Sequence, residues 1–415
     1  MLQDSYDCIV AGAGPAGCTT AAIVAKAGYS TLLVERESFP RFHVGESLMP
    51  EIYWTLQRLG LLEKMRSNQF ISKVGVQFVS HSGRESQPFF FNEHDPRECA
   101  KTWHVERSEF DQMLFDCASD HGAECHDQTR VMDVRFEDNE SQVQLKSNKH
   151  GSKTINARVF VDATGQSALL GNRLGIIEEN PDLRKASIWT YFKGADRCEA
   201  NGSNTTIILH TNDKSAWFWY IPLKNDLVSV GVVSDNDYLL KNRGSIESTF
   251  LEEVEKCEAV KKRIGSAERV EDFRVAKEFS YTTDQHAGDG WVLVGDAFGF
   301  IDPVYSSGVF LALKSGELAA DAIVEGLKTD NLTADQLGNW TGPFESGVHW
   351  MRKLVSAFYT NEFSFGAFMK EHPHFKGNLT DLLIGRVFDD GVGKIFESMD
   401  PAIQQSIERA AGNAM

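Results

Sequence analysis

The glycine-rich segment near the amino terminus limits the fold of this 415-residue sequence more than any other feature. An apolar strand, 6–11, runs directly into Gly12-x-Gly14-x-x-Gly17, and a helix from about Pro15 to Ala27 is expected to follow. A second strand, 30–34, ends at Glu35. Glycines at this spacing permit a tight turn and bring backbone N–H groups close to a pyrophosphate, while an acid about twenty residues later accepts ribose hydroxyls. The segment predicts an α/β fold that binds a dinucleotide; the alternative is a glycine-rich turn in an unrelated α/β unit.

Composition and charge narrow the class of protein. A hydrophobic content of 42% and a charged content of 24% are ordinary for a globular protein, and the length allows about two or three subdomains. The formal net charge of -17 argues against a nucleic-acid partner. The first residues lack the pattern of a signal peptide, and no apolar stretch reaches the roughly 18 residues that a membrane span needs. We therefore expect a cytoplasmic protein without a membrane partner.

The seven cysteines are scattered and form no C-x-x-C pair. This usage suits a reducing compartment and free thiols better than disulfides or zinc, so no metal site is expected. The residues are Cys8, Cys18, Cys99, Cys117, Cys125, Cys198 and Cys257.

Two distant segments indicate FAD rather than a nicotinamide dinucleotide. The run 158–165 has the pattern of a buried strand that ends in a turn with Asp162 and Gly165. The run 290–297 is a similar strand with Gly295 and Asp296 at its end, and a helix from about 308 to 323 is expected after it. FAD is long and two-ended, so a protein that binds it needs a second clamp far from the adenine end. An aspartate after a strand is more often a helix cap than a ligand, and that alternative stays open.

Five further motifs point to a more specific class of flavoprotein. Gly-Glu-Ser occurs within 39–48, and Lys73 begins a Lys-x-Gly-x-x-Phe pattern. The run 217–222 reads Trp-Phe-Trp-Tyr-Ile-Pro, and 302–309 reads Asp-Pro-Val-Tyr-Ser-Ser-Gly-Val before the expected helix. With Arg-x-x-Phe-Asp at 107–111, the sequence resembles the flavin-dependent halogenases of phenols and pyrroles, within the hydroxybenzoate-hydroxylase-like FAD superfamily. The resemblance fades after about residue 332.

The resemblance implies an α/β fold in which a Rossmann-like FAD-binding domain is interleaved with an antiparallel-sheet substrate domain and followed by C-terminal helices. The FAD-binding parts are expected at 1–73, 105–171 and 286–330. The substrate-domain strands are expected at 74–104 and 172–285, and the C-terminal helical region at 331–415.

The resemblance further implies FAD, used as FADH2, as the cofactor. Asp296 resembles the aspartate that this superfamily uses on the ribityl chain, Arg107 is implied near the cofactor, and Ser47 beside the isoalloxazine. For Glu46 and Ser47 the alternative is to cap a helix that is expected to begin near Pro50. The full set implied for FAD is Gly12, Gly14, Pro15, Ala16, Gly17, Glu35, Arg36, Arg41, Ser47, Arg107, Val131, Asp162, Gly165, Gly295, Asp296, Pro303, Gly308 and Val309.

The same resemblance implies how the chemistry is divided among residues. Reduced FAD, made by a separate flavin reductase, forms a C4a-hydroperoxide that oxidises chloride or bromide held by the amides of Ser307 and Gly308. A turn that precedes a helix is a natural anion site, although in related oxygenases these amides hold only the flavin edge. Trp217 and Trp219 keep the organic substrate away from the flavin. Lys73 then delivers hypohalous acid to an electron-rich phenol or pyrrole, free or carrier-bound, and desolvation would favour its neutral amine.

Lys73 and the two tryptophans could also have purely structural roles, and other activities are compatible with the same fold. Lys73 could be an exposed lysine at the start of a strand, and the tryptophans could merely pack a sheet. Tyr305 stands where tryptophan halogenases place a glutamate, so an indole substrate is not expected. The alternative functions are an aromatic monooxygenase or prenyl reductase of the same fold, and a flavin-binding partner without turnover. We expect the halogenase, in a pathway such as antibiotic biosynthesis.

Overall fold

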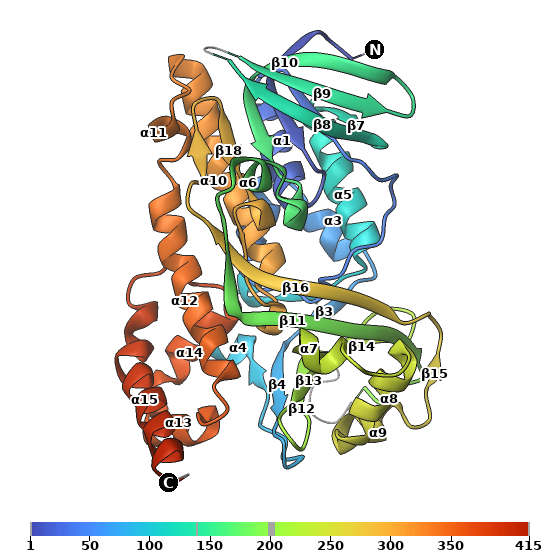
Figure 1. Ribbon diagram of the computed structural model, residues 1–415, viewed down its shortest axis with the longest axis vertical. Helices are drawn as coiled ribbons and strands as arrows, with labels where there is room; N and C mark the ends of the chain where they lie inside the picture. Colours follow the sequence, from blue (N-terminus) through green and yellow to red (C-terminus); the bar gives the residue numbers. More distant parts are fainter. Residues whose placement is uncertain (1, 138–139, 198–203, 414–415) are drawn as a thin grey trace.

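The computed structural model describes residues 2–137, 140–197 and 204–413. Two large sheets lie one above the other in Figure 1, and a column of C-terminal helices runs along one side of both. The α/β fold with C-terminal helices that the sequence predicts is confirmed. None of the described helices combines the length and hydrophobicity that a membrane span requires. The six cysteines in the described part of the chain are free thiols, as expected, and Cys198 lies outside it.

The first sheet carries the glycine motif at the end of its central strand. Its order is β17-β18-β10-β1-β2-β7, and β8 and β9 extend it as antiparallel strands beside β10. β1 pairs in parallel with both β2 and β10. The strands are β1 Ser5–Ala11, β2 Thr31–Val34, β7 Glu124–His126, β8 Thr129–Phe136, β9 Ser141–Ser147, β10 Gly151–Asp162, β17 Ala287–Gly288 and β18 Trp291–Leu293.

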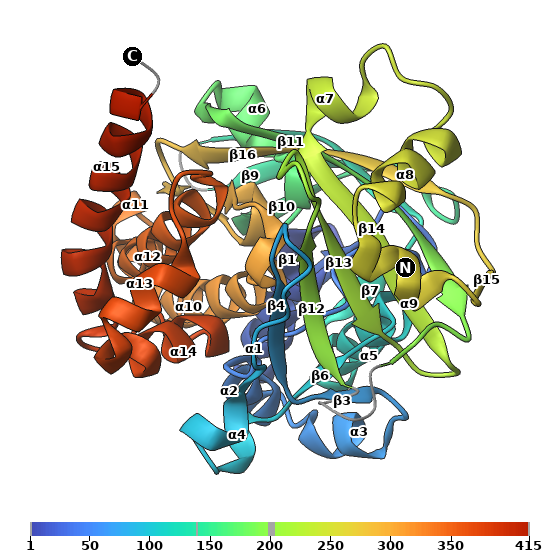
Figure 2. The same cartoon turned by 90° about the horizontal axis from the view of Figure 1, so that it is seen from below.

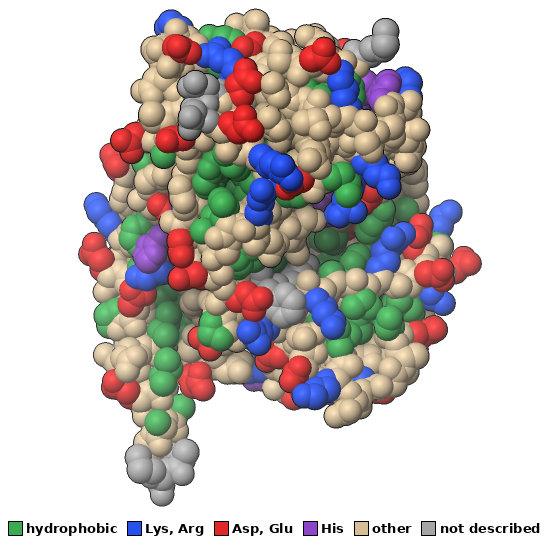
Figure 3. Space-filling view, turned by 45° about the horizontal axis from the view of Figure 1, so that its top comes forward, with side chains coloured by type: hydrophobic (Ala, Val, Ile, Leu, Met, Phe, Trp, Pro, Cys, Tyr) green, Lys and Arg blue, Asp and Glu red, His purple; other side chains and the backbone are tan. Residues whose placement is uncertain are grey.

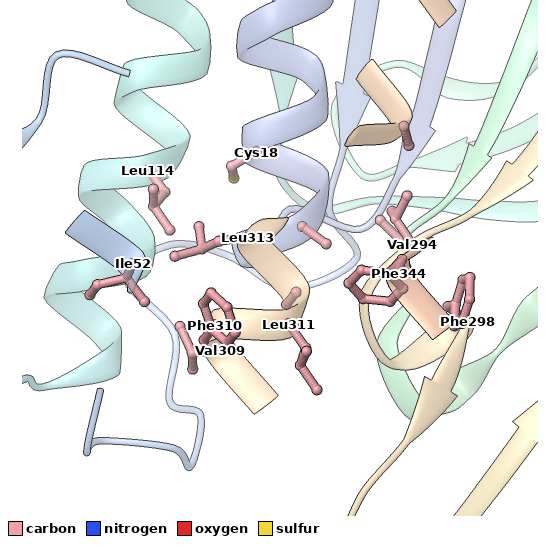
Figure 4. Packing of buried hydrophobic residues seen from close by; sticks show 14 of the residues in the cluster. Cys18, Ile52, Leu114, Val294, Phe298, Val309, Phe310, Leu311, Leu313 and Phe344 are labelled. Atoms are coloured by element: carbon pink, nitrogen blue, oxygen red, sulfur yellow. The ribbon is translucent and has the colours of Figure 1, made fainter. Parts of the chain in front are cut away.

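Helix α1 Pro15–Lys26 packs against β1 and β2 of this sheet and between α5 Arg107–Asp120 and α10 Gly308–Thr329, and α5 also contacts β7. Pro15 occupies the first turn of α1, where its missing N–H costs nothing, so the sequence begins the helix directly after the glycines. Figure 4 shows α10 at the centre of the core, with Phe310 and Leu313 between residues of the neighbouring helices such as Cys18 and Leu114. The apolar sequence of α10 therefore fixes the turn that precedes it. The helix also runs farther than the expected 308–323.

The second sheet is mixed, whereas the sequence predicted an antiparallel one. Its order is β19-β16-β11-β14-β13-β12-β4-β5, and β12 and β4 pair in parallel. Parallel neighbours need a long connection, and here the connection includes much of the first sheet. The strands are β4 Gly75–Val79, β5 Phe89–Phe90, β11 Ile177–Lys193, β12 Thr205–His210, β13 Ala216–Pro222, β14 Leu227–Asp235, β15 Glu268–Arg269 beside β11, β16 Arg274–Thr283 and β19 Gly299–Phe300.

Two strands pair differently from what the predicted segments imply. β19 lies within 286–330 yet pairs with β16 of the second sheet. β6 Thr102–His104 pairs with β3 Ile71–Lys73 in a separate two-stranded ribbon. The segment boundaries themselves stay a prediction.

The second sheet has two different faces because side chains alternate along β13. Phe218 and Tyr220 pack into a cluster with Phe250 of α8 Ile246–Glu255. Trp217 and Trp219 point to the opposite side, toward the first sheet. The short helices α7 Asn236–Leu240 and α9 Glu258–Ile264 lie near α8 on the outer face (Figures 1 and 2).

The C-terminal helices form a separate layer that Figure 2 shows beside α10. It consists of α11 Ala334–Leu337, α12 Thr341–Tyr359, α13 Phe365–Glu371, α14 Lys376–Ile384 and α15 Ile395–Asn413. Arg386, after α14, pairs with Glu51 and Asp95, and so ties the layer to the region of α2 Ile52–Arg58 and α4 Phe91–His94. The remaining α-helices among the described residues are α3 Leu62–Ser67 and α6 Leu169–Leu174.

Candidate active site

A cavity of about 420 Å³ lies between the two sheets, at the carboxyl ends of β1, β2 and β10. The space-filling view shows a hollow near the middle of one face, with hydrophobic side chains inside it and Lys and Arg side chains beside it (Figure 3). Most of the residues expected from the sequence line the cavity: Gly12, Gly14, Pro15, Ala16, Glu35, Arg36, Arg41, Ser47, Arg107, Val131, Gly165, Trp217, Trp219, Gly295, Asp296, Pro303, Gly308 and Val309. Gly17, Lys73, Asp162 and Ser307 are not among the lining residues.

The glycines are sterically required where the chain crosses the end of the first sheet. Gly12 has a φ of +101°, and a Cβ there would lie 2.2 Å from the carbonyl oxygen of Ala163. A Cβ on Gly17 would lie 1.9 Å from the carbonyl oxygen of Gly12. Gly17 therefore allows close packing of helix and strand rather than contact with a ligand. Glu35 accepts a hydrogen bond from the Ala13 N–H at 3.1 Å, which orients its carboxylate beside the turn.

Asp162 differs from the sequence expectation of a direct cofactor contact. Its carboxylate is fully buried and accepts hydrogen bonds from the N–H and hydroxyl of Thr164 and from the N–H of Leu170. It holds the turn in which Ala163, Thr164 and Gly165 line the cavity. Asp162 is not an N-cap residue either, because Ala168 occupies that position of α6, but its carboxylate does accept the Leu170 N–H from the first turn of that helix.

Two arginines anchor the walls of the cavity. Arg107 donates to both carboxylate oxygens of Asp111, at 2.8 and 2.9 Å, and to the carbonyl of Val44 at 2.6 Å. Gly45 has a φ of +112°, and a Cβ there would lie 2.9 Å from the Arg107 guanidinium. Arg107 therefore fixes the strap, which we define as residues 44–48. Arg41 lies 3.2 Å from Asp111, and its buried Nε lacks a hydrogen-bond partner within the described residues.

The strap connects the cavity to Lys73. The Ser47 hydroxyl is 2.7 Å from that of Thr206, and both residues line the cavity. One residue further, the carbonyl of Leu48 accepts a hydrogen bond from Lys73 Nζ at 2.9 Å. Neither Glu46 nor Ser47 caps α2, because Glu51 occupies the N-cap position of that helix.

Lys73 is buried, and this excludes the interpretation of an ordinary surface lysine. It is the last residue of β3 and only 1% exposed. Burial lowers the pKa of its amine to about 7, because removal of water penalises the charged form. Its Nζ lies 5.6 Å from the centre of the Phe91 ring. Lys73 is therefore an amine with a substantial neutral fraction near neutral pH.

Trp217 and Trp219 form a wall of the cavity with ring centres 6.4 Å apart. Each indole N–H is held by a hydrogen bond: Trp217 donates to the Tyr359 hydroxyl at 2.9 Å and Trp219 to the Ser229 hydroxyl at 3.1 Å. Gly231 lies opposite Trp219 in β14, and a Cβ there would be 2.2 Å from the indole. The sheet therefore both supports and orients the two rings.

The turn 302–308 leads directly into α10. Ser306 has a φ of +61° and donates its N–H to the carbonyl of Pro303 at 2.8 Å. Ser307 is the N-cap of α10, and Gly308 is its first residue. The first N–H groups of a helix have no acceptor within the helix, so this end attracts an anion. Ser307 is fully buried, and its hydroxyl has no hydrogen-bond partner within the described residues.

Comparisons with known proteins show the family to which the chain belongs. A model of the tryptophan halogenase family matches residues 92–364, and one of FAD dependent oxidoreductases matches residues 7–172. The chain belongs to the flavin-dependent halogenases. A 1H-pyrrole-2-carbonyl-[peptidyl-carrier protein] chlorinase of Pseudomonas fluorescens is 32% identical, with 96% of this chain and 93% of the relative covered. The corresponding brominase of Pseudoalteromonas luteoviolacea is 31% identical, with 93% of each covered. A solved structure of the flavin-dependent brominase Bmp2 has a TM-score of 0.86 and 29% identity, with 98% of this chain and 100% of that chain covered.

The residues around the cavity of this halogenase fit FAD. The glycine turn offers close backbone approach, and the buried Arg41 Nε, which lies 3.5 Å from the Glu35 carboxylate without a hydrogen bond to it, faces the same cavity and suits a phosphate oxygen. At the other end, Asp296 lines the cavity, and burial raises the pKa of its carboxyl to about 6. Such a carboxyl is suited to hydrogen bonds with sugar-like hydroxyls. The apolar wall of Trp217 and Ile208 suits a flat ring.

Sequence reasoning missed three residues at this site of the halogenase. Burial raises the pKa of Glu46 to about 7, an effect that hydrogen bonds from Tyr191 and Ser229 partly offset. His104 is fully buried and hydrogen-bonded to Thr206 at 2.9 Å. The Gly-Glu-Ser motif could have identified Glu46. The third residue, Tyr359, lies beyond the part of the sequence with a recognisable motif.

Proposed function

We propose that this halogenase oxidises chloride or bromide at the Ser307–Gly308 turn and transfers the halogen, through Lys73, to a pyrrole or phenol. The observation that carries the proposal is the burial of Lys73 beside the strap. Its amine binds the carbonyl of Leu48, and the preceding strap residue, Ser47, lines the cavity. A separate flavin reductase would supply reduced FAD. The two relatives named for a 1H-pyrrole-2-carbonyl-[peptidyl-carrier protein] support a pyrrole that is bound to a carrier protein.

Each part of the cavity has a task in this mechanism. The glycine turn and Arg41 hold the pyrophosphate, Glu35 the adenosine ribose, and Asp296 the ribityl chain. Reduced FAD, when bound, supplies the two electrons with which molecular oxygen is activated to oxidise the halide. The amide of Gly308 holds the halide by hydrogen bonding and by the positive end of α10.

The tryptophan wall separates the flavin from the organic substrate. Trp217 and Trp219 occupy the side of the cavity that faces the second sheet, so a ring cannot approach the flavin from that side. A hypohalous acid molecule is small enough to pass such a wall. The neutral amine of Lys73 then holds it beside the ring that is to be halogenated. The ring attacks the halogen as the bond between oxygen and halogen breaks, and the hydroxide that leaves is released as water with the proton that the ring loses. Desolvation favours this step because it keeps the amine uncharged.

Product analysis with a panel of substrates tests the proposal. Reduced FAD from an unrelated flavin reductase, bromide and the purified chain are incubated with free phenols, free pyrroles and a pyrrolyl carrier protein. Mass spectrometry should show the isotope doublet of bromine on the carrier-bound pyrrole. The Lys73→Ala variant should still consume reduced flavin without halogenating. Halogenation at the wild-type rate by Lys73→Ala would contradict the role of the amine, and substrate-dependent oxidation of NADPH by the isolated chain would indicate a hydroxylase instead.

A further inference from the structure

Tyr359, the last residue of α12, joins two parts of the site that are far apart in the sequence. Its hydroxyl donates a hydrogen bond to the carboxylate of Asp302 at 2.8 Å and accepts one from the indole N–H of Trp217 at 2.9 Å. Asp302 begins the turn that ends at Gly308, and Trp217 belongs to the wall. One hydroxyl thus contacts both the halide turn, which we define as 302–308, and the tryptophan wall.

The contact to Asp302 is strong because the carboxylate is buried. Asp302 is only 1% exposed, and its second oxygen accepts the N–H of Val304 at 3.1 Å. Burial raises the pKa of this carboxyl to about 6, and the Tyr359 hydrogen bond counteracts the effect of burial. Hydrogen bonds to a charged group in a dry environment are stronger than those between neutral groups. Loss of the hydroxyl would leave a buried carboxylate oxygen unpaired at the base of the turn.

Neighbouring groups keep the Tyr359 ring in place. Lys185 Nζ lies 4.1 Å from the ring centre and is itself bound to Asp235 at 2.6 Å. The adjacent Phe358 contacts Trp217, with ring centres 5.8 Å apart, and Tyr305 of the halide turn, with ring centres 5.9 Å apart. The end of α12 is therefore wedged between the wall and the turn by two consecutive aromatic residues.

We propose that Tyr359 is a positioning residue that couples the tryptophan wall to the halide turn, so that the C-terminal helices control where the halide is held. The inference rests on the proposed function, because it assumes that the turn holds the halide. It assigns to α12 a role in the oxidation of the halide and not only in the shape of the substrate site. Tyr359 acts through Asp302 and Trp217.

The test compares Tyr359→Phe with Tyr220→Phe. Tyr220 lies in the same strand as Trp217 but faces the other cluster, where its buried hydroxyl donates to the carbonyl of Asp196 at 2.7 Å. Both variants lose a tyrosine hydroxyl, and only the first loses a contact with the site. We expect the KM for bromide to rise about tenfold in Tyr359→Phe, with an unchanged rate of reduced-flavin consumption and a lower yield of halogenated product per flavin. Tyr220→Phe should keep the wild-type KM.

A spectroscopic measurement without cofactor checks the contact itself. In a ¹H–¹⁵N spectrum of the indole groups, the Trp217 signal is identified by its loss in Trp217→Phe. This signal should move in Tyr359→Phe, while the Trp219 signal, whose N–H binds Ser229, stays in place. If Tyr359→Phe folds poorly, Trp217→Phe removes the donor but retains the hydroxyl, and it should also raise the KM for bromide.

The outcomes separate the two proposals. Failure of the wild-type protein to halogenate any substrate refutes the proposed function. If the Trp217 signal does not move in Tyr359→Phe, the positioning role of Tyr359 is refuted, whatever the activity. When the wild-type protein is active, an unchanged KM for bromide in Tyr359→Phe also refutes the positioning role of Tyr359. An equal rise of that KM in Tyr220→Phe refutes it as well, because the effect would then be a general loss of stability.

Discussion

Replacement of Lys73 by methionine should make the protein more stable while it abolishes halogenation. Methionine has a similar length and carries no charge to desolvate. Burial lowers the pKa of Lys73 from 10.5 to about 7. At pH values below 7 the buried charged amine therefore reduces the free energy of unfolding by roughly 5 kcal/mol. The variant also loses the hydrogen bond to the Leu48 carbonyl, at a cost of about 1–3 kcal/mol. At pH 7 itself the cost is about 4 kcal/mol, because half of the folded molecules then carry a neutral amine, so we expect a net gain of about 1–3 kcal/mol in the free energy of unfolding.

The pH dependence gives the sharper test of this reasoning. Because the pKa is lower in the folded state, the unfolded chain binds more protons between pH about 7 and 10.5. The stability of the wild-type protein relative to the variant therefore rises with pH, by about 1.4 kcal/mol per pH unit. From pH 7.5 to 9.5 the advantage of Lys73→Met should shrink by roughly 2–3 kcal/mol.

Urea unfolding of the cofactor-free protein at several pH values measures this difference. Lys262→Met, at an exposed position on α9, is the matched control and should show no such trend. A difference between Lys73→Met and wild type that does not change with pH would mean that Lys73 stays charged when folded. The argument that burial supplies a neutral amine would then be wrong.

Three further predictions concern other parts of the site. A Cβ at Gly231 would lie 2.2 Å from the Trp219 ring, so Gly231→Ala should displace the indole, cost about 1–3 kcal/mol of stability and lower the halogenated product per flavin; an unchanged yield would argue against the wall. A Cβ at Gly308 meets no atom within 4 Å, so Gly308→Ala should unfold at the wild-type temperature but raise the KM for bromide; an unchanged KM would argue against the halide site. The pKa of the Glu46 carboxyl is raised from 4.5 to about 7 in the folded protein. Its contribution to the free energy of unfolding is therefore fully present below pH 4.5 and is lost as the pH rises through 7. Urea unfolding should therefore show Glu46→Gln nearly equal to wild type at pH 5 but more stable by about 3 kcal/mol at pH 8, and equal stability at both values would refute the shift.

The sequence was most informative where backbone geometry leaves little choice. Gly12 and Gly17 are the residues that a strand–turn–helix at a pyrophosphate site requires, and their spacing predicted that turn correctly. Trp217 and Trp219 alternate with Phe218 and Tyr220, so a strand with two different faces follows from the order of residues alone. Local patterns of this kind depend on neighbours along the chain.

The features that the sequence could not predict depend on contacts between distant segments. The family resemblance implied a desolvated amine at Lys73, but its neighbours in sequence fit an exposed lysine at the start of a strand equally well, and its burial depends on the strap, which is distant in sequence. Tyr359 lies 142 residues from Trp217 and 57 from Asp302, and its aromatic-rich segment indicates a role near the substrate but not these two contacts. The parallel pairing of β4 with β12 also joins segments with a large part of the chain between them.

The position of β10 has a consequence for synthesis of the protein. One edge of this strand pairs with β1, and the other pairs with β18 at Phe160, Val161 and Asp162. On the ribosome, β18 emerges only after every strand from β11 to β17 has been made. Throughout that interval the nascent chain exposes the apolar end of β10 as an open sheet edge, which is a template for aggregation. Truncated chains that stop before Trp291 should therefore depend on chaperones, whereas chains that include α10 should not.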